Sequence, residues 1–153
     1  MKLLATTCLP LIALLLLAAC GSTGTFSGHG GTRAATILSH VDGSDPGFPE
    51  AGVYLINSPG ELEVLGSELL TSVAVDFANQ SMIVLALGEQ PTTGWAAHIN
   101  GAQHVGGQLY VQGTAQGPGE DEAVGQALTY PVAAVIVPKL NAEMIHPEIA
   151  DAM

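Results

Sequence analysis

Two long apolar runs stand out in the pattern of hydrophobic and polar positions along the chain. Ser81 to Leu87 reads SMIVLAL and is bounded by Gly88, and Pro131 to Val137 reads PVAAVIV and is followed by Pro138. Their length and their branched residues favour β-strands. We therefore predict a buried strand at each of these two positions.

One helix is predicted from Pro59 to about Leu70. Ser58 fits the N-cap, Pro59 fits the first helical position, and Glu61 stands at the third, from which its carboxylate can reach back to the cap. Leucines then recur at i, i+3 and i+7 and form one apolar stripe: Leu62, Leu65 and Leu69. The pattern thus predicts a single short amphipathic helix.

Further strands are predicted at residues 36–41, 52–57 and 94–99. A hairpin follows, in which Ala102 to Val105 and Gln108 to Gln112 flank Gly106-Gly107, a two-residue turn that requires positive φ. The chain also holds 19 Gly and 9 Pro, which favours strands and turns. The predicted fold class is mainly β (small α+β): an antiparallel sheet or sandwich with one short amphipathic helix.

The N-terminus predicts export and lipid attachment. Leu9 to Ala19 is an apolar run too short for a membrane-spanning helix but typical of a signal-peptide core. It ends in Leu-Ala-Ala-Cys20 and resembles a bacterial lipobox, in which the Cys is acylated and becomes the new N-terminus. The alternative is an ordinary secretory signal in which Cys20 stands by chance. We expect a signal peptide at 1–19, a flexible tether at 20–35, one domain at 36–140 and a C-terminal tail at 141–153.

Charge and cysteine content narrow the classes of function. The chain has 14 acidic and 3 basic residues, a formal net charge of −11 with His neutral. Nucleic-acid binding requires Lys and Arg to neutralise phosphates, so this composition argues against it. Loss of Cys8 with the signal peptide and acylation of Cys20 would leave no thiol for a disulfide, a thiolate metal site or a Cys nucleophile.

No pattern in the sequence predicts catalysis, a metal or a cofactor. The sequence lacks the Gly-x-Ser-x-Gly elbow, the His-Glu-x-x-His zinc motif, the phosphate loop and the dinucleotide fingerprint. Residues 42–47 favour a turn over a calcium loop, and Glu120 to Glu122 favour a solvated acidic loop over a cation or docking site. His98 and His104 would meet only if their strands paired, so we predict strand-face histidines.

The most informative stretch is the loop PTTGW, which follows one predicted strand and precedes another. Pro91 fixes φ, Gly94 permits an unusual turn, Thr92 and Thr93 offer hydroxyls, and Trp95 is the only tryptophan of the chain. Trp is enriched at binding hot spots, which favours a partner-binding loop formed by these five residues. The competing interpretation is that Trp95 points into the core and the loop is only a tight connection.

Several motifs resemble the C-terminal domain of the protease complex subunit PrcB. They are Val75-Asp-Phe77, the strand from Ser81 to Gly88, Pro91-Thr-Thr-Gly-Trp95, and Leu128-Thr-Tyr-Pro131 with an apolar strand after it. The resemblance covers roughly residues 52–139, and the chain departs from the family's Pro-Thr-Gly-Gly-Tyr at Thr93 and Trp95. It implies a non-catalytic lipoprotein that associates with an exported protease and stabilises it.

The same loop also resembles the first binding loop of chagasin-type inhibitors of papain-like cysteine proteases, which reads Asn-Pro-Thr-Thr-Gly followed by an aromatic residue. Gln90 replaces the Asn, and the Arg-Pro-Trp loop of that family has no counterpart in this sequence. Both families present the motif on a mainly β scaffold, so the predicted fold is the same for either.

The sequence therefore predicts a lipid-anchored, non-catalytic protein of the bacterial cell envelope, in the outer membrane if the cell has two membranes. Its expected partner is a protease bound through Pro91–Trp95, and its link to the membrane is the lipid, including palmitate, on Cys20. The alternatives are a chagasin-like inhibitor of cysteine proteases and a small-ligand-binding lipoprotein.

Overall fold

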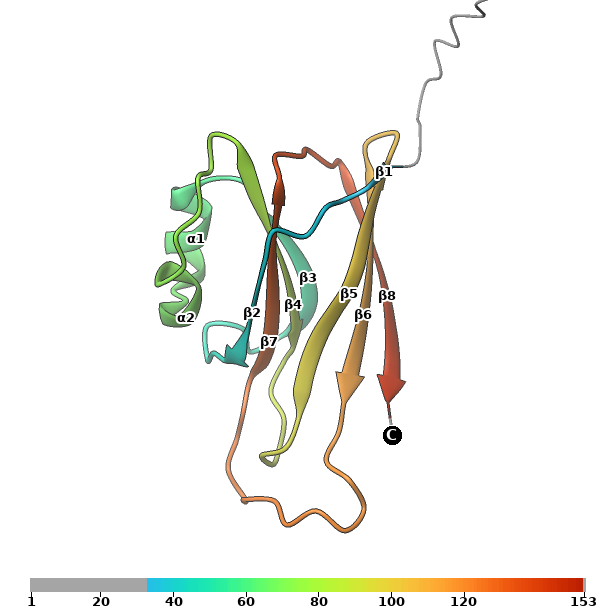
Figure 1. The fold of residues 1–153 in the computed structure, drawn as a ribbon. Helices are drawn as coiled ribbons and strands as arrows, with labels where there is room; N and C mark the ends of the chain where they lie inside the picture. The colour runs from blue at the N-terminus through green and yellow to red at the C-terminus, as the bar shows by residue number, and fades with distance from the viewer. Residues whose placement is uncertain (1–32, 153) are drawn as a thin grey trace, which may run out of the picture.

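The fold consists of two four-stranded sheets and two short helices, and it is known from a computed structural model that describes residues 33–152 (Figure 1). The elements in chain order are β1 (Arg33–Ala34), β2 (Ser39–Ser44), β3 (Ala51–Ile56), α1 (Pro59–Leu65), α2 (Glu68–Thr71), β4 (Gln80–Leu87), β5 (Ala96–Val105), β6 (Gln108–Gln116), β7 (Pro131–Pro138) and β8 (Met144–Ala152). The predicted mainly β fold class is confirmed.

The two sheets face each other as a sandwich. One has the order β2-β7-β4-β3 and is antiparallel throughout, and the other has the order β1-β5-β6-β8, in which β8 runs parallel to β6. Figure 1 shows both helices on the side of the first sheet that faces away from the second. The molecule thus has three layers: helices, first sheet and second sheet.

Strands β4 and β7 lie at the centre of the first sheet and are buried on both faces. The side chains between the two sheets form one core: Ile83, Leu85, Ala97, Ile99, Ala102, Leu109, Val111, Ala133, Val135 and Val137. Those between the first sheet and the helices form the other: Phe48, Ile56, Leu62, Leu70, Met82, Val84, Ala86, Val132 and Ala134. A strand between two cores needs apolar residues at every position, so the two continuous apolar runs form the strands predicted for them.

The predicted single helix is two helices, which corrects its predicted extent. Ser58 caps α1 as expected, since its Oγ accepts a hydrogen bond from the Glu61 N–H at 3.2 Å. Gly66 then takes a left-handed conformation, with φ +65°, and ends α1. Ser67 starts α2 as its N-cap, because its Oγ accepts from the Leu70 N–H at 3.0 Å. A Gly followed by a capping Ser ends one helix and begins another.

The segment around Asp45 also differs from expectation. The first strand was predicted at residues 36–41 and a turn at 42–47, whereas β2 runs from Ser39 to Ser44. Asp45 is buried and accepts hydrogen bonds from the Gly47 N–H (2.8 Å), the Ser67 hydroxyl (2.6 Å) and the Leu69 N–H (3.1 Å). This carboxylate therefore fixes the start of α2 to the end of β2.

The predicted hairpin is confirmed, and the C-terminal tail is corrected. Gly106 and Gly107 both have positive φ, +55° and +82°, and join β5 to β6. Residues 141–153 were expected to be a tail, but β8 occupies Met144–Ala152 and pairs with β6 along its whole length. Pro147 weakened the strand pattern, because Pro disfavours a central strand; β8 lies at an edge, where Pro is tolerated.

Candidate functional site

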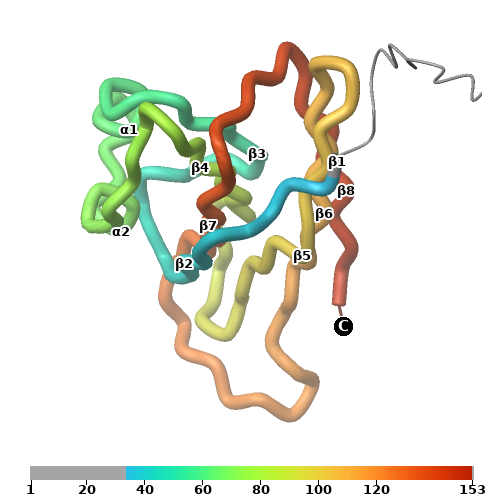
Figure 2. The backbone as a smooth tube through the Cα atoms, turned by 45° about the horizontal axis from the view of Figure 1, so that its top comes forward, coloured from blue at the N-terminus to red at the C-terminus, as the bar shows by residue number. Residues whose placement is uncertain are grey.

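The predicted binding loop connects β4 to β5 and is held by the long loop between β6 and β7. Gln90 forms an isolated antiparallel bridge with Thr129, through N–H to O distances of 2.8 and 3.0 Å. The side-chain amide of Gln90 also donates to the Leu87 carbonyl at 3.0 Å. In Figures 1 and 2 the two loops hang side by side from the same end of the sandwich. The loop is thus anchored at its start to both neighbouring segments.

The two threonines of the motif form hydrogen bonds within the protein. The Thr93 Oγ1 accepts from the Gly125 N–H at 2.8 Å, and the Thr93 N–H donates to the Gly125 carbonyl at 3.0 Å. The Thr92 carbonyl accepts from the Thr129 hydroxyl at 2.9 Å. The Thr93 hydroxyl, expected to be offered to a partner, therefore binds the β6–β7 loop.

Gly94 packs closely against the β6–β7 loop. Its φ is +92°, a conformation that L side chains rarely adopt. A Cβ at this position would stand 2.9 Å from the Pro118 Cβ and 3.1 Å from the Val124 Cγ1. Both the backbone conformation and the close approach require glycine here.

Trp95 is half-buried and belongs to neither core. Its ring lies over Gly117, where an added Cβ would be 3.3 Å from the nearest ring atom. The indole therefore rests on the start of the β6–β7 loop while part of it stays exposed. Trp95 therefore does not point into either core, contrary to what the competing interpretation expected.

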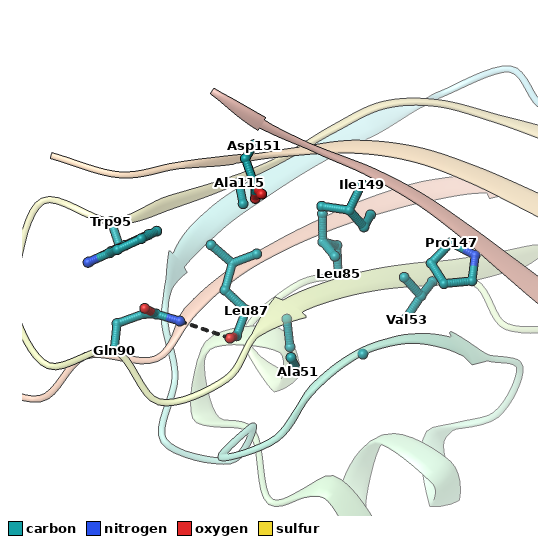
Figure 3. A pocket seen from close by; sticks show the side chains of 12 residues that line it. Ala51, Val53, Leu85, Leu87, Gln90, Trp95, Ala115, Pro147, Ile149 and Asp151 are labelled. Atoms are coloured by element: carbon teal, nitrogen blue, oxygen red, sulfur yellow. Dashed lines mark hydrogen bonds between the residues drawn. The ribbon is translucent and has the colours of Figure 1, made fainter. Parts of the chain in front are cut away.

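Trp95 closes one end of a groove between β3 and β8, which we call the edge groove (Figure 3). The groove has a volume of about 430 Å³. The residues that give it its character come from three strands and the loop: Val53, Leu85, Leu87, Trp95, Ile149 and Asp151. Figure 3 shows Trp95 and Gln90 at one end and Val53 and Pro147 at the other.

A second hollow of about 820 Å³ continues from the edge groove beyond Trp95. It is lined by Trp95 and Asp151, which it shares with the groove, and by Gly117, Pro118 and Glu120 of the β6–β7 loop. Of the acidic residues 120–122, only Glu120 lines this hollow, and Glu122 accepts a hydrogen bond from the Gly119 N–H at 3.1 Å. Trp95 and Asp151 therefore stand at the junction of two connected depressions.

The charge around this junction is negative. Asp151 and Glu120 are its ionisable side chains, and none of the described residues that line either hollow is basic. The Lys139 ammonium lies elsewhere and donates to the Asn57 and Phe77 carbonyls at 2.7 and 2.8 Å. A cationic group would thus find no competing positive charge among the lining residues.

Tyr130 contacts Glu89 at the base of the two loops. Its hydroxyl donates to the Glu89 Oε2 at 2.9 Å. This hydrogen bond, followed by desolvation and by the charge of Glu89, raises the pKa of Tyr130 above its ordinary value of 10.0. The contact links the segment just after β4 to the segment just before β7.

The sequence did not predict the β8 side of the groove. Pro147, Ile149 and Asp151 lie in the segment expected to be a tail, and Val53 was expected only as a strand residue. Ile145, Pro147 and Ile149 alternate with other residues, and this period-two pattern is the one signal in the sequence for a strand here.

The histidines give no metal site within residues 33–152, where no three His, Cys, Asp or Glu side chains are placed to hold an ion. His98 and His104 lie on the same strand, β5, so strand pairing does not bring them together. Cys20 and most of the expected tether lie outside the described residues. Neither helix of the described part is long and apolar enough to cross a membrane.

Comparison with known families matches residues 81–138 to the family described as PrcB C-terminal. The matched stretch runs from β4 to β7 and contains both the Pro91–Trp95 loop and the β6–β7 loop that holds it. Neither a search of curated proteins nor a search of solved structures found a match. The resemblance drawn from the motifs is therefore confirmed, and residues 81–138 of this chain form a PrcB C-terminal-like region.

Proposed function

We propose that this chain is a lipid-anchored, non-catalytic protein of the bacterial cell envelope that binds and stabilises an exported protease. The observation that carries the proposal is the PrcB C-terminal match, which includes the Pro91–Trp95 loop. The motifs of the sequence resemble those of the protease complex subunit PrcB, and an accessory role in such a complex requires a binding surface. The non-catalytic part rests on the lack of catalytic motifs in the sequence.

The geometry of the loop supports binding through Trp95. Several hydrogen bonds hold the loop to the β6–β7 loop, so little conformational entropy is lost when a partner contacts it. A half-buried tryptophan on a fixed loop offers a large apolar surface of the kind that is enriched at binding hot spots. Exposed Pro91 stands on the same loop and adds a rigid neighbour.

Site-specific cross-linking in the native envelope tests the protease partner. A photoreactive residue at exposed Pro91 should capture a protease, identified by mass spectrometry. The matched control carries the same probe at exposed Gln112, on the outer face of the second sheet. Capture of no protease from Pro91, or equal capture from both positions, would contradict the proposal. Removal of the chain should also lower the amount of the captured protease.

Lipid attachment and location are tested separately at Cys20. The unaltered chain should incorporate labelled palmitate and partition with the envelope, and Cys20→Ser should do neither. Cys8→Ser is the control, because Cys8 lies within the predicted signal peptide. A Cys20→Ser variant that still incorporates palmitate would refute the anchor.

A further inference from the structure

We propose that the edge groove binds an extended segment of a protein partner, with apolar side chains in the groove and a basic side chain at Asp151. This inference rests on the proposed function, since it requires that the chain binds a protein. It adds the place of binding and the chemistry of the bound segment.

The first support is that two strands flank the groove with edges that pair with no other strand within residues 33–152. β3 is an edge strand of the first sheet and β8 an edge strand of the second, and the two contact each other along this side of the sandwich. The Glu89 N–H donates to the Pro49 carbonyl at 3.2 Å, so Pro49 and Glu89 form a hydrogen-bonded pair, and Ala51 and Leu87, two residues further along, form the next one. Hydrogen-bonded and non-hydrogen-bonded pairs alternate in an antiparallel ladder. Gly52 therefore belongs to a non-hydrogen-bonded pair, and its N–H and C=O point away from β4. An extended segment can pair with such an edge.

The second support is the apolar lining. Val53, Leu87 and Ile149 line the groove. Val53 and Leu87 are half-buried and Ile149 is 37% exposed, so all three keep apolar surface in contact with water. In an extended segment every second side chain points the same way, so alternate apolar residues of a partner would face this lining. Burial of these three side chains would remove apolar surface from water, which favours binding.

The third support is charge. Asp151 lies on the groove side of β8, whereas Glu148 of the same strand lies on the opposite face and accepts a hydrogen bond from the Gln112 amide at 3.2 Å. Glu120 adds a second carboxylate in the adjoining hollow. The chain as a whole has a formal net charge of −11. A basic segment is therefore attracted to the groove, and an acidic one is repelled.

Trp95 provides a reporter of occupancy, because it is the only tryptophan of the chain and closes one end of the groove. Displacement of water from its exposed edge shifts indole emission to shorter wavelengths. The fluorescence of this one residue therefore reports binding in the edge groove.

The test uses the mature chain with Cys20→Ser and ten-residue synthetic peptides. An alternating Val-Lys peptide should shift Trp95 emission saturably, and an alternating Val-Glu peptide should bind at least about tenfold more weakly at low salt. Asp151→Asn should weaken binding of the Val-Lys peptide about two- to fivefold, the effect of one exposed ion pair. Glu148→Gln removes the same charge from the other face of β8 and should leave binding unchanged. A Val-Lys peptide that is N-methylated at every residue has no backbone N–H to donate to a strand edge and should not bind.

Several results would overturn the proposal. Two of these are equal binding of the Lys and Glu peptides and equal effects of Asp151→Asn and Glu148→Gln. The third is an emission shift that the peptides do not produce. If only a fatty acid produces it, the occupant is a lipid, and if only concentrating the chain produces it, the occupant is a second copy. Protease capture by the Pro91 probe without groove binding of the peptides leaves the proposed function standing and rejects this inference. Absence of protease capture rejects the proposed function itself.

Discussion

Substitution of Gly94 by Ala tests whether the two loops are packed as tightly as the structure indicates. Gly94 has a φ of +92°, which is unfavourable for Ala, and the new Cβ would lie 2.9 Å from the Pro118 Cβ. We expect about 1–2 kcal/mol from the backbone conformation and about 1–3 kcal/mol from the overpacking. The total expected loss in the free energy of unfolding is about 2–5 kcal/mol, less if the β6–β7 loop moves away.

Gly106→Ala is the matched control for this experiment. Gly106 also has a positive φ, +55°, but no atom lies within 4 Å of an added Cβ. It should lose only the backbone part, about 1–2 kcal/mol. The difference between the two variants therefore measures the contact between the loops.

Urea unfolding followed by both Trp95 fluorescence and far-ultraviolet circular dichroism measures these losses. Trp95 lies beside Gly94 and over Gly117, so separation of the loops should change its emission before the sheets unfold. We expect the two signals to diverge in Gly94→Ala and to coincide in Gly106→Ala. Equal destabilisation of the two variants, or native emission from folded Gly94→Ala, would refute the close packing of the loops.

Two further predictions concern contacts outside the loops' interface. Asp45→Asn should lower the free energy of unfolding by about 2–4 kcal/mol, because a buried carboxylate that accepts three hydrogen bonds becomes an amide that cannot accept them all. The control, Asp42→Asn, changes an exposed carboxylate and should alter the free energy of unfolding by less than about 0.5 kcal/mol. Equal losses in urea unfolding would contradict the role of Asp45. The raised pKa of Tyr130 stabilises the fold below pH 10.0, and this contribution is lost as pH rises through the folded-state pKa. Glu89→Gln should lower that pKa in a spectrophotometric titration assigned with Tyr130→Phe, and an unchanged midpoint would show that the Glu89 contact is not its cause.

The parts of the fold that the sequence predicted are those with strong local signals. The runs 82–87 and 131–137 are apolar at every position because each strand is buried on both faces, and their short length and branched residues favour strands over helices. Gly106-Gly107 marks its hairpin by the positive φ that the turn requires. The break between α1 and α2 also had a local signal, Gly66 followed by Ser67, but the leucine stripe continued across it.

The parts that could not be predicted depend on segments far apart in the chain. β8 pairs in parallel with β6, and no turn sequence marks a parallel partner. The edge groove then combines Val53, Leu85, Trp95 and Ile149, whose contact exists only once both sheets have formed. Asp151 looked like one of many surface acids, because its placement on the groove side follows from the register of β8.

The position of the PTTGW motif changes what its residues mean for binding. Thr92, Thr93 and Gly94 contact the β6–β7 loop: the two threonines accept hydrogen bonds from it, and the glycine packs closely against it. Three of the five predicted binding residues thus have structural contacts of their own, and they fix Trp95 at the junction of the edge groove and the adjoining hollow. A partner that contacts Trp95 from the edge groove also meets β3, β8 and Asp151, none of which belongs to the motif. Binding by this chain is therefore expected to depend on the groove as much as on the loop that closes it.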